Sequence, residues 1–218
     1  MYCCFMRRRR GVNIKLKCLF SILLDTLLKS SKLSKKHKQN TVRIGAGEWR
    51  SRLLQFPDAE GLRPTPDRVR QTVFNWLGQD LTGKVCLDLF AGTGVMGFEA
   101  LSRNAKSVAL VELAKAPYQA LLHNQSTLKA AGVQIVQQDA LQFLAGNQQK
   151  FDVIFCDPPY QQQWMDKLLP LLGEHLAEGG LLYAEAEYAI ESNAQWDVVK
   201  HGKAGNVYYH LLKWSKSF

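Results

Sequence analysis

The sequence predicts an α/β fold, a mostly parallel, doubly wound sheet of seven strands preceded by a small lobe of one hairpin and one helix. Three observations predict it. Apolar runs that begin at Val85, Ser107, Val133 and Phe151 indicate buried strands, and helix-like segments lie between them. A glycine-rich turn follows the first run and a Pro-Pro turn follows the fourth. After a fifth strand, GGLLYAEAE, two further strand-like runs joined by a glycine-containing turn predict a terminal hairpin.

The net charge of +9 is distributed unevenly along the 218 residues. Residues 1–40 hold 11 of the 28 Lys/Arg residues and one of the 19 acids, so the rest of the chain carries a net charge of −1. The apolar run within 18–28 is shorter than the roughly twenty residues that span a bilayer, and no small-residue cleavage site follows it. We therefore interpret residues 1–40 as a basic extension outside the fold; an arm that touches RNA is the alternative.

The cysteines and histidines show no metal-ligand or CxxC spacing, so we expect no metal site. Cys86 and Cys156 fall within apolar strand runs, which is typical of buried, reduced thiols in a cytoplasmic protein. No feature of the sequence requires an oligomer, so we expect a monomer, and we expect no association with a membrane.

Residues 41–80 are predicted to form the N-terminal lobe. Two short strand-like runs joined through Gly45 and Gly47 indicate a hairpin, and Thr65, followed by Pro66 and Asp67, is a helix start with Thr65 as the cap. The lobe holds six arginines within 28 residues, together with a tryptophan. A solvated charged face is one interpretation of these arginines, and an RNA-contacting surface is the other.

Residues 81–218 are predicted to form the main domain, which begins with a strand and a turn of sequence VCLDLFAGTGVMG. Gly92 and Gly94 let the backbone approach a ligand and turn into a helix expected from about Val95 to Arg103. The carboxylate of Asp88 stands before the loop, which suits a cationic sulfonium amino acid better than a pyrophosphate.

Two further acids end the next two predicted strands. Glu112 comes about twenty residues after the first loop glycine, the spacing at which an acid meets ribose hydroxyls in such folds. A helix from about Lys115 to Ala131, with Gly132 as its C-cap, leads to a strand that ends at Asp139 and Ala140. Each acid alone is commonly a helix cap or a solvent contact, but three at successive strand ends indicate a ligand site.

The fourth predicted strand ends in Asp-Pro-Pro-Tyr, residues 157–160. A planar amino group, such as that of a nucleobase, becomes a nucleophile when its hydrogens are held by acceptors that favour a pyramidal nitrogen. Asp157 and the carbonyl of Pro158 are two such acceptors, and Tyr160 can stack on the base. The alternative is a rigid turn without chemistry. The following segment indicates a helix broken or kinked near Pro170.

Five segments, RIGAGEWRSR, LRPTPDRVRQTVFNWL, DLFAGTG, EALSR and DPPY, resemble the RsmD family of bacterial enzymes. The likeness runs from Val42 to Trp214 and leaves residues 1–40 outside. It implies the Rossmann-like fold of class I S-adenosylmethionine-dependent methyltransferases, and methylation of a guanine N2 amino group in small-subunit (16S) ribosomal RNA or the assembled subunit. The family often has DPPF where this chain has DPPY, and Tyr160 keeps the aromatic ring.

The resemblance also implies roles for individual residues. Its donor-binding residues correspond to Asp88, Phe90, Gly92, Gly94, Glu112, Asp139 and Ala140, with Asn75 near the donor. Its reactive residues correspond to Asp157, Pro158, Pro159 and Tyr160. Its RNA-contacting residues correspond to Arg43, Trp49, Arg50, Arg63, Arg68 and Arg70. Two other functions stay open: an adenine-N6 methyltransferase acting on DNA or RNA, and a donor-binding ribosome-assembly factor without catalysis.

Overall fold

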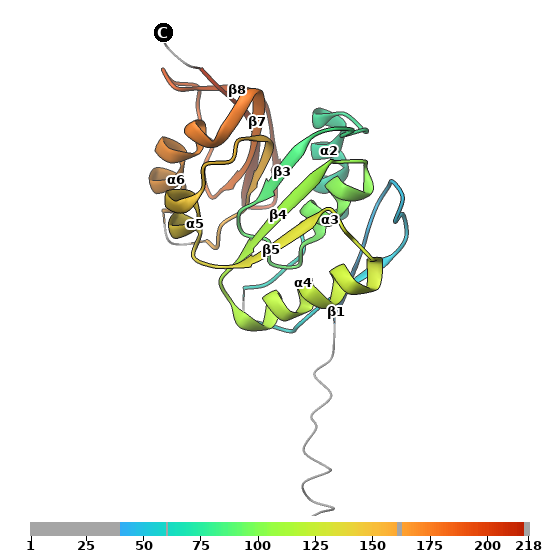
Figure 1. The fold of residues 1–218 in the computed structure, drawn as a ribbon. Coiled ribbons are helices and arrows are strands. Elements are labelled where there is room, and N and C mark those ends of the chain that lie inside the picture. Colours follow the sequence, from blue (N-terminus) through green and yellow to red (C-terminus); the bar gives the residue numbers. More distant parts are fainter. Residues whose placement is uncertain (1–39, 60, 161–162, 216–218) are drawn as a thin grey trace, which may run out of the picture. The chain divides into compact units, whose positions relative to one another are not determined.

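The computed structural model describes residues 40–59, 61–160 and 163–215, and the predictions for residues 1–39 lie outside that range. Seven strands form one sheet in the order β5-β4-β3-β6-β7-β9-β8 (Figure 1). Their bounds are β3 Val85–Asp88, β4 Ser107–Glu112, β5 Val133–Gln137, β6 Phe151–Cys156, β7 Leu176–Ala186, β8 Trp196–Ala204 and β9 Val207–Trp214. All neighbouring pairs are parallel except those made by β9, which confirms the predicted sheet and its terminal hairpin.

The strand order reverses beside β3, which pairs with β4 on one side and with β6 on the other. The chain winds outward in both directions from this point, so the loops that follow β3 and β6 lead to helices on opposite faces of the sheet, α3 (Val95–Ser102) and α6 (Trp164–Leu172). Ligands of open α/β sheets bind at such a switch point.

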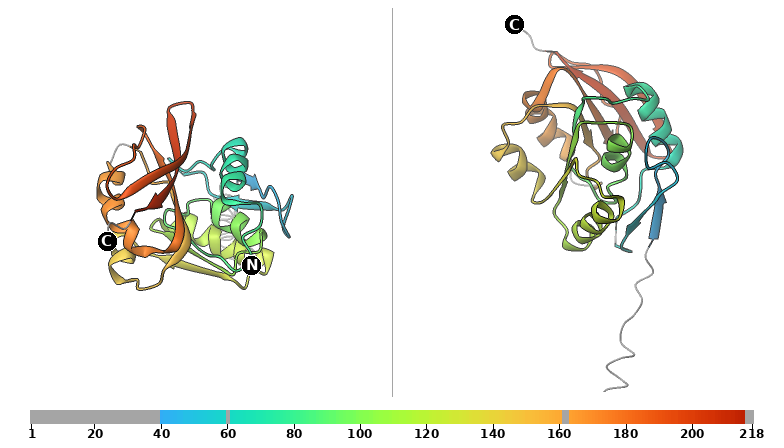
Figure 2. Two further views of the ribbon diagram at one scale, coloured as in Figure 1. Left: turned by 90° about the horizontal axis from the view of Figure 1, so that it is seen from above. Right: turned by 45° about the vertical axis from the view of Figure 1, so that its right-hand side comes forward.

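Helices cover both faces of the sheet (Figures 1 and 2). On one face lie α2 (Asp67–Leu77), α3 (Val95–Ser102) and α4 (Lys115–Leu128), with a core that includes Phe74, Phe98 and Phe155. On the other lie α5 (Ala140–Gly146) and α6 (Trp164–Leu172), with a core that includes Phe151, Leu168 and Trp196. The continuous apolar character of β6 follows from this arrangement, because both of its faces are covered.

The predicted hairpin is a separate two-stranded antiparallel sheet of β1 (Asn40–Arg43) and β2 (Leu53–Phe56). Ile44 and Leu54 are buried and belong to the same core as Phe74, so the lobe shares its interior with the main sheet. The loop between the strands packs against α3: Gly47 has φ +82°, and a Cβ there would lie 1.8 Å from the carbonyl oxygen of Ser102. Only glycine fits this approach.

Three helix boundaries differ from the predictions. Helix α2 begins after Pro66 without a side-chain cap. Thr65, the predicted cap, is buried, and its backbone carbonyl accepts from Arg70 Nη1 at 3.2 Å. Helix α4 ends at Leu128, where Lys129 takes the left-handed C-cap position in place of Gly132. Helix α6 is not broken at the proline.

Pro170 lies inside α6, only two residues before its last residue, Leu172. A 3-10 turn, η1 (Gly173–His175), follows directly. The missing N–H of Pro170 removes one intrahelical bond, the one that this position would donate to the carbonyl of Asp166, and only two helical residues follow it.

Cys86 and Cys156 are buried free thiols, as predicted. Across the residues that the structure describes, no helix has both the length and the apolar character needed to span a membrane.

Candidate active site

Four acids stand at the carboxyl ends of four adjacent parallel strands. Asp88 ends β3 and Glu112 ends β4, while Asp139 and Asp157 follow β5 and β6. Because these strands are neighbours in the order β5-β4-β3-β6, their ends meet at one edge of the sheet. The structure therefore brings together the acids that the sequence analysis placed at successive strand ends.

The glycine turn is braced by two of these acids. Gly92 has φ +51° and donates its N–H to Glu112 Oε2 at 2.9 Å, and the other oxygen of Glu112 accepts from Ala114 N at 2.7 Å. Asp88 Oδ2 accepts from Gly97 N, in the first turn of α3, at 3.1 Å. Gly94, with φ +75°, carries the chain from the turn into α3.

The environments of these acids differ. Asp88 is buried, and burial raises the pKa of its carboxyl to about 7. The hydrogen bond from the Gly97 N–H lowers this pKa, and the charge of Glu112 adds to the rise. A cation placed beside Asp88 would restore its negative charge. Asp139 Oδ1 caps α5 by accepting from Leu141 N at 2.9 Å and Gln142 N at 3.1 Å. Ala140 is the buried first residue of that helix.

Phe90 lies next to a residue that the sequence analysis missed. Its ring meets that of Trp164, at the start of α6, edge to face with centroids 5.3 Å apart. The indole Nε1 of Trp164 is buried and has no hydrogen-bond partner among the described residues. The helix signal of α6 could have suggested a core tryptophan, but not its position against the glycine turn.

The Asp-Pro-Pro-Tyr loop leaves the sheet beside this turn. Asp157 is partly exposed, Pro158 is buried, and Pro159 and Tyr160 are exposed. Loss of contact with water, followed by the charges of Glu185 and Asp88, raises the pKa of Asp157 well above its usual range. Tyr160 stays a neutral phenol at physiological pH, because loss of water contact raises its pKa.

The buried acid Glu185 on β7 was also missed. Its side chain accepts from the Tyr183 hydroxyl at 2.5 Å. The signal lay in the run Tyr183-Ala-Glu185-Ala-Glu187, where polar side chains alternate with alanines at the end of the strand.

Most of the arginines expected to contact RNA are accessible. Arg43, Arg50, Arg63 and Arg68 are exposed on the hairpin, the following loops and α2. Trp49 is partly buried, and its backbone N–H donates to Ser102 Oγ at 2.9 Å. This arrangement brings the hairpin loop and α2 close together, on the face of the sheet that carries α3 (Figure 2).

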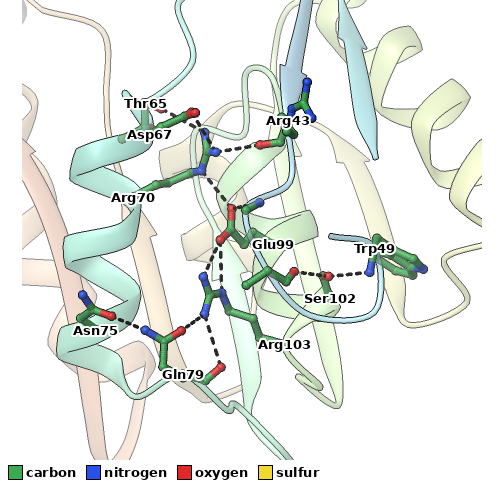
Figure 3. Close-up of polar contacts among 12 residues, drawn as sticks. Arg43, Trp49, Thr65, Asp67, Arg70, Asn75, Gln79, Glu99, Ser102 and Arg103 are labelled. Carbon is green, nitrogen blue, oxygen red and sulfur yellow. Dashed lines mark hydrogen bonds and ion pairs between the residues drawn. The ribbon is translucent and has the colours of Figure 1, made fainter. Parts of the chain in front are cut away.

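Arg70 differs from the other arginines, being only 2% exposed. Its Nε donates to Glu99 Oε2 at 3.0 Å, and its Nη2 donates to the Arg43 carbonyl at 2.7 Å and faces Asp67 Oδ1 at 3.0 Å (Figure 3). This burial corrects the prediction that Arg70 contacts RNA, because its guanidinium group binds partners inside the protein.

Asn75 is also displaced from its predicted place. It is exposed, and its Oδ1 accepts from the Gln79 side chain, which in turn accepts from Arg103 Nη1 (Figure 3). Arg103 follows the C-terminal end of α3, whereas the glycine turn lies at its N-terminal end. These contacts argue against a position of Asn75 beside the donor.

The described residues contain no group of three or more His, Cys, Asp or Glu arranged to hold a metal ion. The acids at the strand ends are instead bound to backbone N–H groups or buried next to one another.

The fold is that of the class I, Rossmann-like methyltransferases, with the reversed strand β9 between β7 and β8. A putative methyltransferase from Escherichia coli matches it with a TM-score of 0.73 and 38% identity, over 82% of this chain and 100% of that one. A second putative methyltransferase, solved in complex with SAH, shares the fold at 18% identity with a TM-score of 0.62, over 80% of this chain and 56% of its own.

The family model described as "Conserved hypothetical protein 95" matches residues 42–213. The chain belongs to this family, which is the RsmD family that the sequence resembles. Ribosomal RNA small subunit methyltransferase D of Escherichia coli (strain K12) is 41% identical to it over 179 residues, which are 79% of this chain and 89% of the relative.

Proposed function

We propose that this protein transfers a methyl group from S-adenosylmethionine to ribosomal RNA, and that its target is the N2 amino group of a guanine in the small subunit. The observation that carries the proposal is the row of acids at the switch point, with the Asp-Pro-Pro-Tyr loop beside it. Membership of the family, and the name of the 41% identical relative, support ribosomal RNA as the substrate. The methylation would take place in the cytoplasm, where ribosomal subunits are located.

The donor site fits a cationic nucleoside. Bound S-adenosylmethionine supplies a methyl group activated by a sulfonium charge. Asp88, buried with a raised pKa, would ionise beside the ammonium group of the amino acid part, and Glu112 would accept ribose hydroxyls. The turn at Gly92 and Gly94 lets the ligand approach the backbone. Phe90, Asp139 and Ala140 would line the adenine, and the unpartnered Nε1 of Trp164 adds a donor at this place.

The reactive site consists of residues 157–160. Asp157 and the carbonyl of Pro158 would each accept one hydrogen of the amino group, which opposes delocalisation of the nitrogen lone pair and stabilises the charge that develops on it. Pro159 keeps the loop stiff. The ring of Tyr160, which is 47% exposed, would stack on the guanine base once that base has flipped out of its RNA helix.

The RNA would lie against residues 41–80. Arg43, Arg50, Arg63 and Arg68 present charges for phosphates, and Trp49 presents part of its ring. Since residues 41–218 carry a net charge of −1, the attraction would be local to this lobe.

Methylation of unmodified small subunits tests the proposal. RNA from subunits incubated with the protein and S-adenosylmethionine is digested to nucleosides, and we expect N2-methylguanosine. N6-methyladenosine without N2-methylguanosine would instead support an adenine methyltransferase. Asp157→Ala should lower the rate by roughly a hundredfold or more while donor affinity changes little. Donor binding with an unchanged rate in Asp157→Ala, or no methyl transfer by the wild type, would contradict the proposed chemistry.

A further inference from the structure

Asp157 and Glu185 are neighbours across two parallel strands. The ladder pairs Cys156 of β6 with Ala184 of β7, and Asp157 and Glu185 are the next residues along each chain. Neighbouring strands lie about 4.8 Å apart, so the two carboxyls start from backbone positions close enough to contact each other.

Extending the alternation of side chains along β6 and β7 by one residue predicts the same face of the sheet for both acids. Side chains alternate along a strand, so each acid shares a face with the residue two positions before it. For Asp157 that residue is Phe155, and for Glu185 it is Tyr183; both belong to the core under α2 and α3, and their rings are in contact with centroids 6.3 Å apart. The two acids therefore extend this contact to the edge of the sheet.

Glu185 is buried, with 5% of its surface exposed, and no ion pair of the described residues includes it. Its one hydrogen bond from a side chain comes from the hydroxyl of Tyr183, which is itself fully buried. A buried acid without a cation stays charged only at a large cost in free energy, or it holds a proton. A proton held by Glu185 would lie next to a second carboxyl, that of Asp157.

The titratable groups around Asp157 are carboxyls, phenols and the buried thiol of Cys156, whose pKa is raised by burial and then by the charge of Asp157. Glu185 on β7 and Asp88 on β3 face it, and burial raises the pKa of all three carboxyls. Tyr160 and Tyr183 also lie within the field of its charge. Two adjacent carboxyls that interact strongly lose their protons in two coupled steps, so one proton stays on the pair over the range between the steps.

We propose that Glu185 is a positioning residue for Asp157: the two carboxyls share one proton, and the pair takes up the proton that the amino group releases on methylation. This inference rests on the proposed function. The proposal assigns the shared proton to Glu185: its carbonyl oxygen accepts from the Tyr183 hydroxyl, and its own hydroxyl would donate to Asp157, which is then ionised and accepts the N–H of the base.

The step balances in atoms and charge. The nitrogen lone pair forms the N–CH3 bond, the S–CH3 bond breaks, and its electron pair stays on sulfur. The nitrogen then gives one N–H proton to Asp157. Before the step the sulfonium carries +1 and the pair −1; afterwards the sulfide, the methylated base and the doubly protonated pair are all neutral. No oxidant or further reactant is needed.

The first test measures the protein without donor. Carboxyl carbons of aspartate are labelled with carbon-13, and the Asp157 signal, assigned with Asp157→Asn, is followed through a pH titration. We expect two steps in the wild type and in Glu178→Gln, which alters an exposed acid of the same strand. We expect the step that reports Glu185 to be missing in Glu185→Gln, while any step caused by Asp88 stays as in the wild type. An Asp157 signal with the same titration in wild type and Glu185→Gln would overturn the proposal.

The second test is kinetic and uses rescue by a neutral side chain. Glutamine has the donor and acceptor of a protonated glutamate, so Glu185→Gln should keep kcat within about threefold. Glu185→Ala should lower kcat by roughly a hundredfold with little change in the KM for the donor. A kcat for Glu185→Gln as low as that of Glu185→Ala, or a wild-type kcat in both, would overturn the proposal. If the wild type methylates no ribosomal RNA, the proposed function fails, and the donor-free titration still decides whether the pair exists.

Discussion

Asp88 shows how one buried carboxyl links the site to stability. Burial raises its pKa from 3.8 to about 7. Between those values the unfolded chain is ionised at this residue while the folded chain is neutral, so the folded state loses stability as the pH rises. The contribution is complete below pH 3.8 and lost as the pH passes about 7. The loss is on the order of 4 kcal/mol at 1.36 kcal/mol for each pKa unit.

We therefore predict that Asp88→Asn is more stable than the wild type at pH 8 and gains little at pH 4. The asparagine carbonyl can still accept the Gly97 N–H, and it carries no charge to bury. Urea unfolding of both proteins at the two pH values measures the difference. Asp157 and Glu185 have the same sign of dependence and are present in both proteins; removing the charge of Asp88 also lowers the pKa of Asp157, which adds to the gain at pH 8.

Asp80→Asn is the control for this comparison. Asp80 is exposed, and the side chains of Asn104 and Thr82 lower its pKa, so its substitution should give no gain at pH 8. An equal stability difference between wild type and Asp88→Asn at both pH values would contradict the predicted titration.

At the scale of the elements, one buried carboxylate joins α2, α3 and the hairpin loop. Glu99 of α3 accepts from Arg70 Nε of α2 at 3.0 Å, from Arg103 Nη2 at 2.7 Å and from Gly45 N at 3.1 Å (Figure 3). Because α3 begins at the glycine turn, the proposed RNA-contacting lobe is fixed directly to the helix that follows the proposed donor-binding turn.

Two arginines of α2 should separate stability from RNA binding. Arg70→Met leaves Glu99 with one cation fewer and frees two carbonyls, so it should cost about 3–5 kcal/mol of unfolding free energy. Arg68→Met, at an exposed position on the same helix, should change stability by less than about 0.5 kcal/mol and weaken RNA binding. Chemical denaturation and binding to ribosomal RNA measure both; equal stability of the two variants would contradict the assignment of Arg70.

The elements themselves could largely be predicted from the sequence, because strand periodicity, glycine turns and prolines act locally. The burial of Arg70 could not, since Arg68 and Arg70 look alike in sequence and only the arrival of Glu99 and the Arg43 carbonyl distinguishes them. Glu185 was missed for a related reason. A glutamate near the end of a strand usually reaches solvent, and its burial depends on how β6 and β7 are paired.

At the scale of the whole chain, charge separates the described fold from the N-terminal extension. Residues 1–40 carry 11 basic residues and one acid, and residues 41–218 carry a net charge of −1. If the lobe alone holds the RNA through the exposed arginines that the family resemblance assigns to this role, the phosphates are met by four of them, Arg43, Arg50, Arg63 and Arg68. The two interpretations of the extension therefore differ in how many counterions RNA binding releases.

We predict that a chain starting at Asn40 methylates small subunits at a rate within about twofold of the full chain. The logarithm of the affinity for ribosomal RNA falls with the logarithm of salt concentration by roughly 0.7–0.9 for each phosphate neutralised. A slope of no more than about 4 is expected for the four arginines, and it should change by less than about 1 on truncation. Binding titrations from low to moderate salt measure both slopes. A fall of several units on truncation, with loss of subunit binding at moderate salt, would show instead that the basic extension contacts RNA, because its 11 Lys/Arg residues are the charges that the truncation removes.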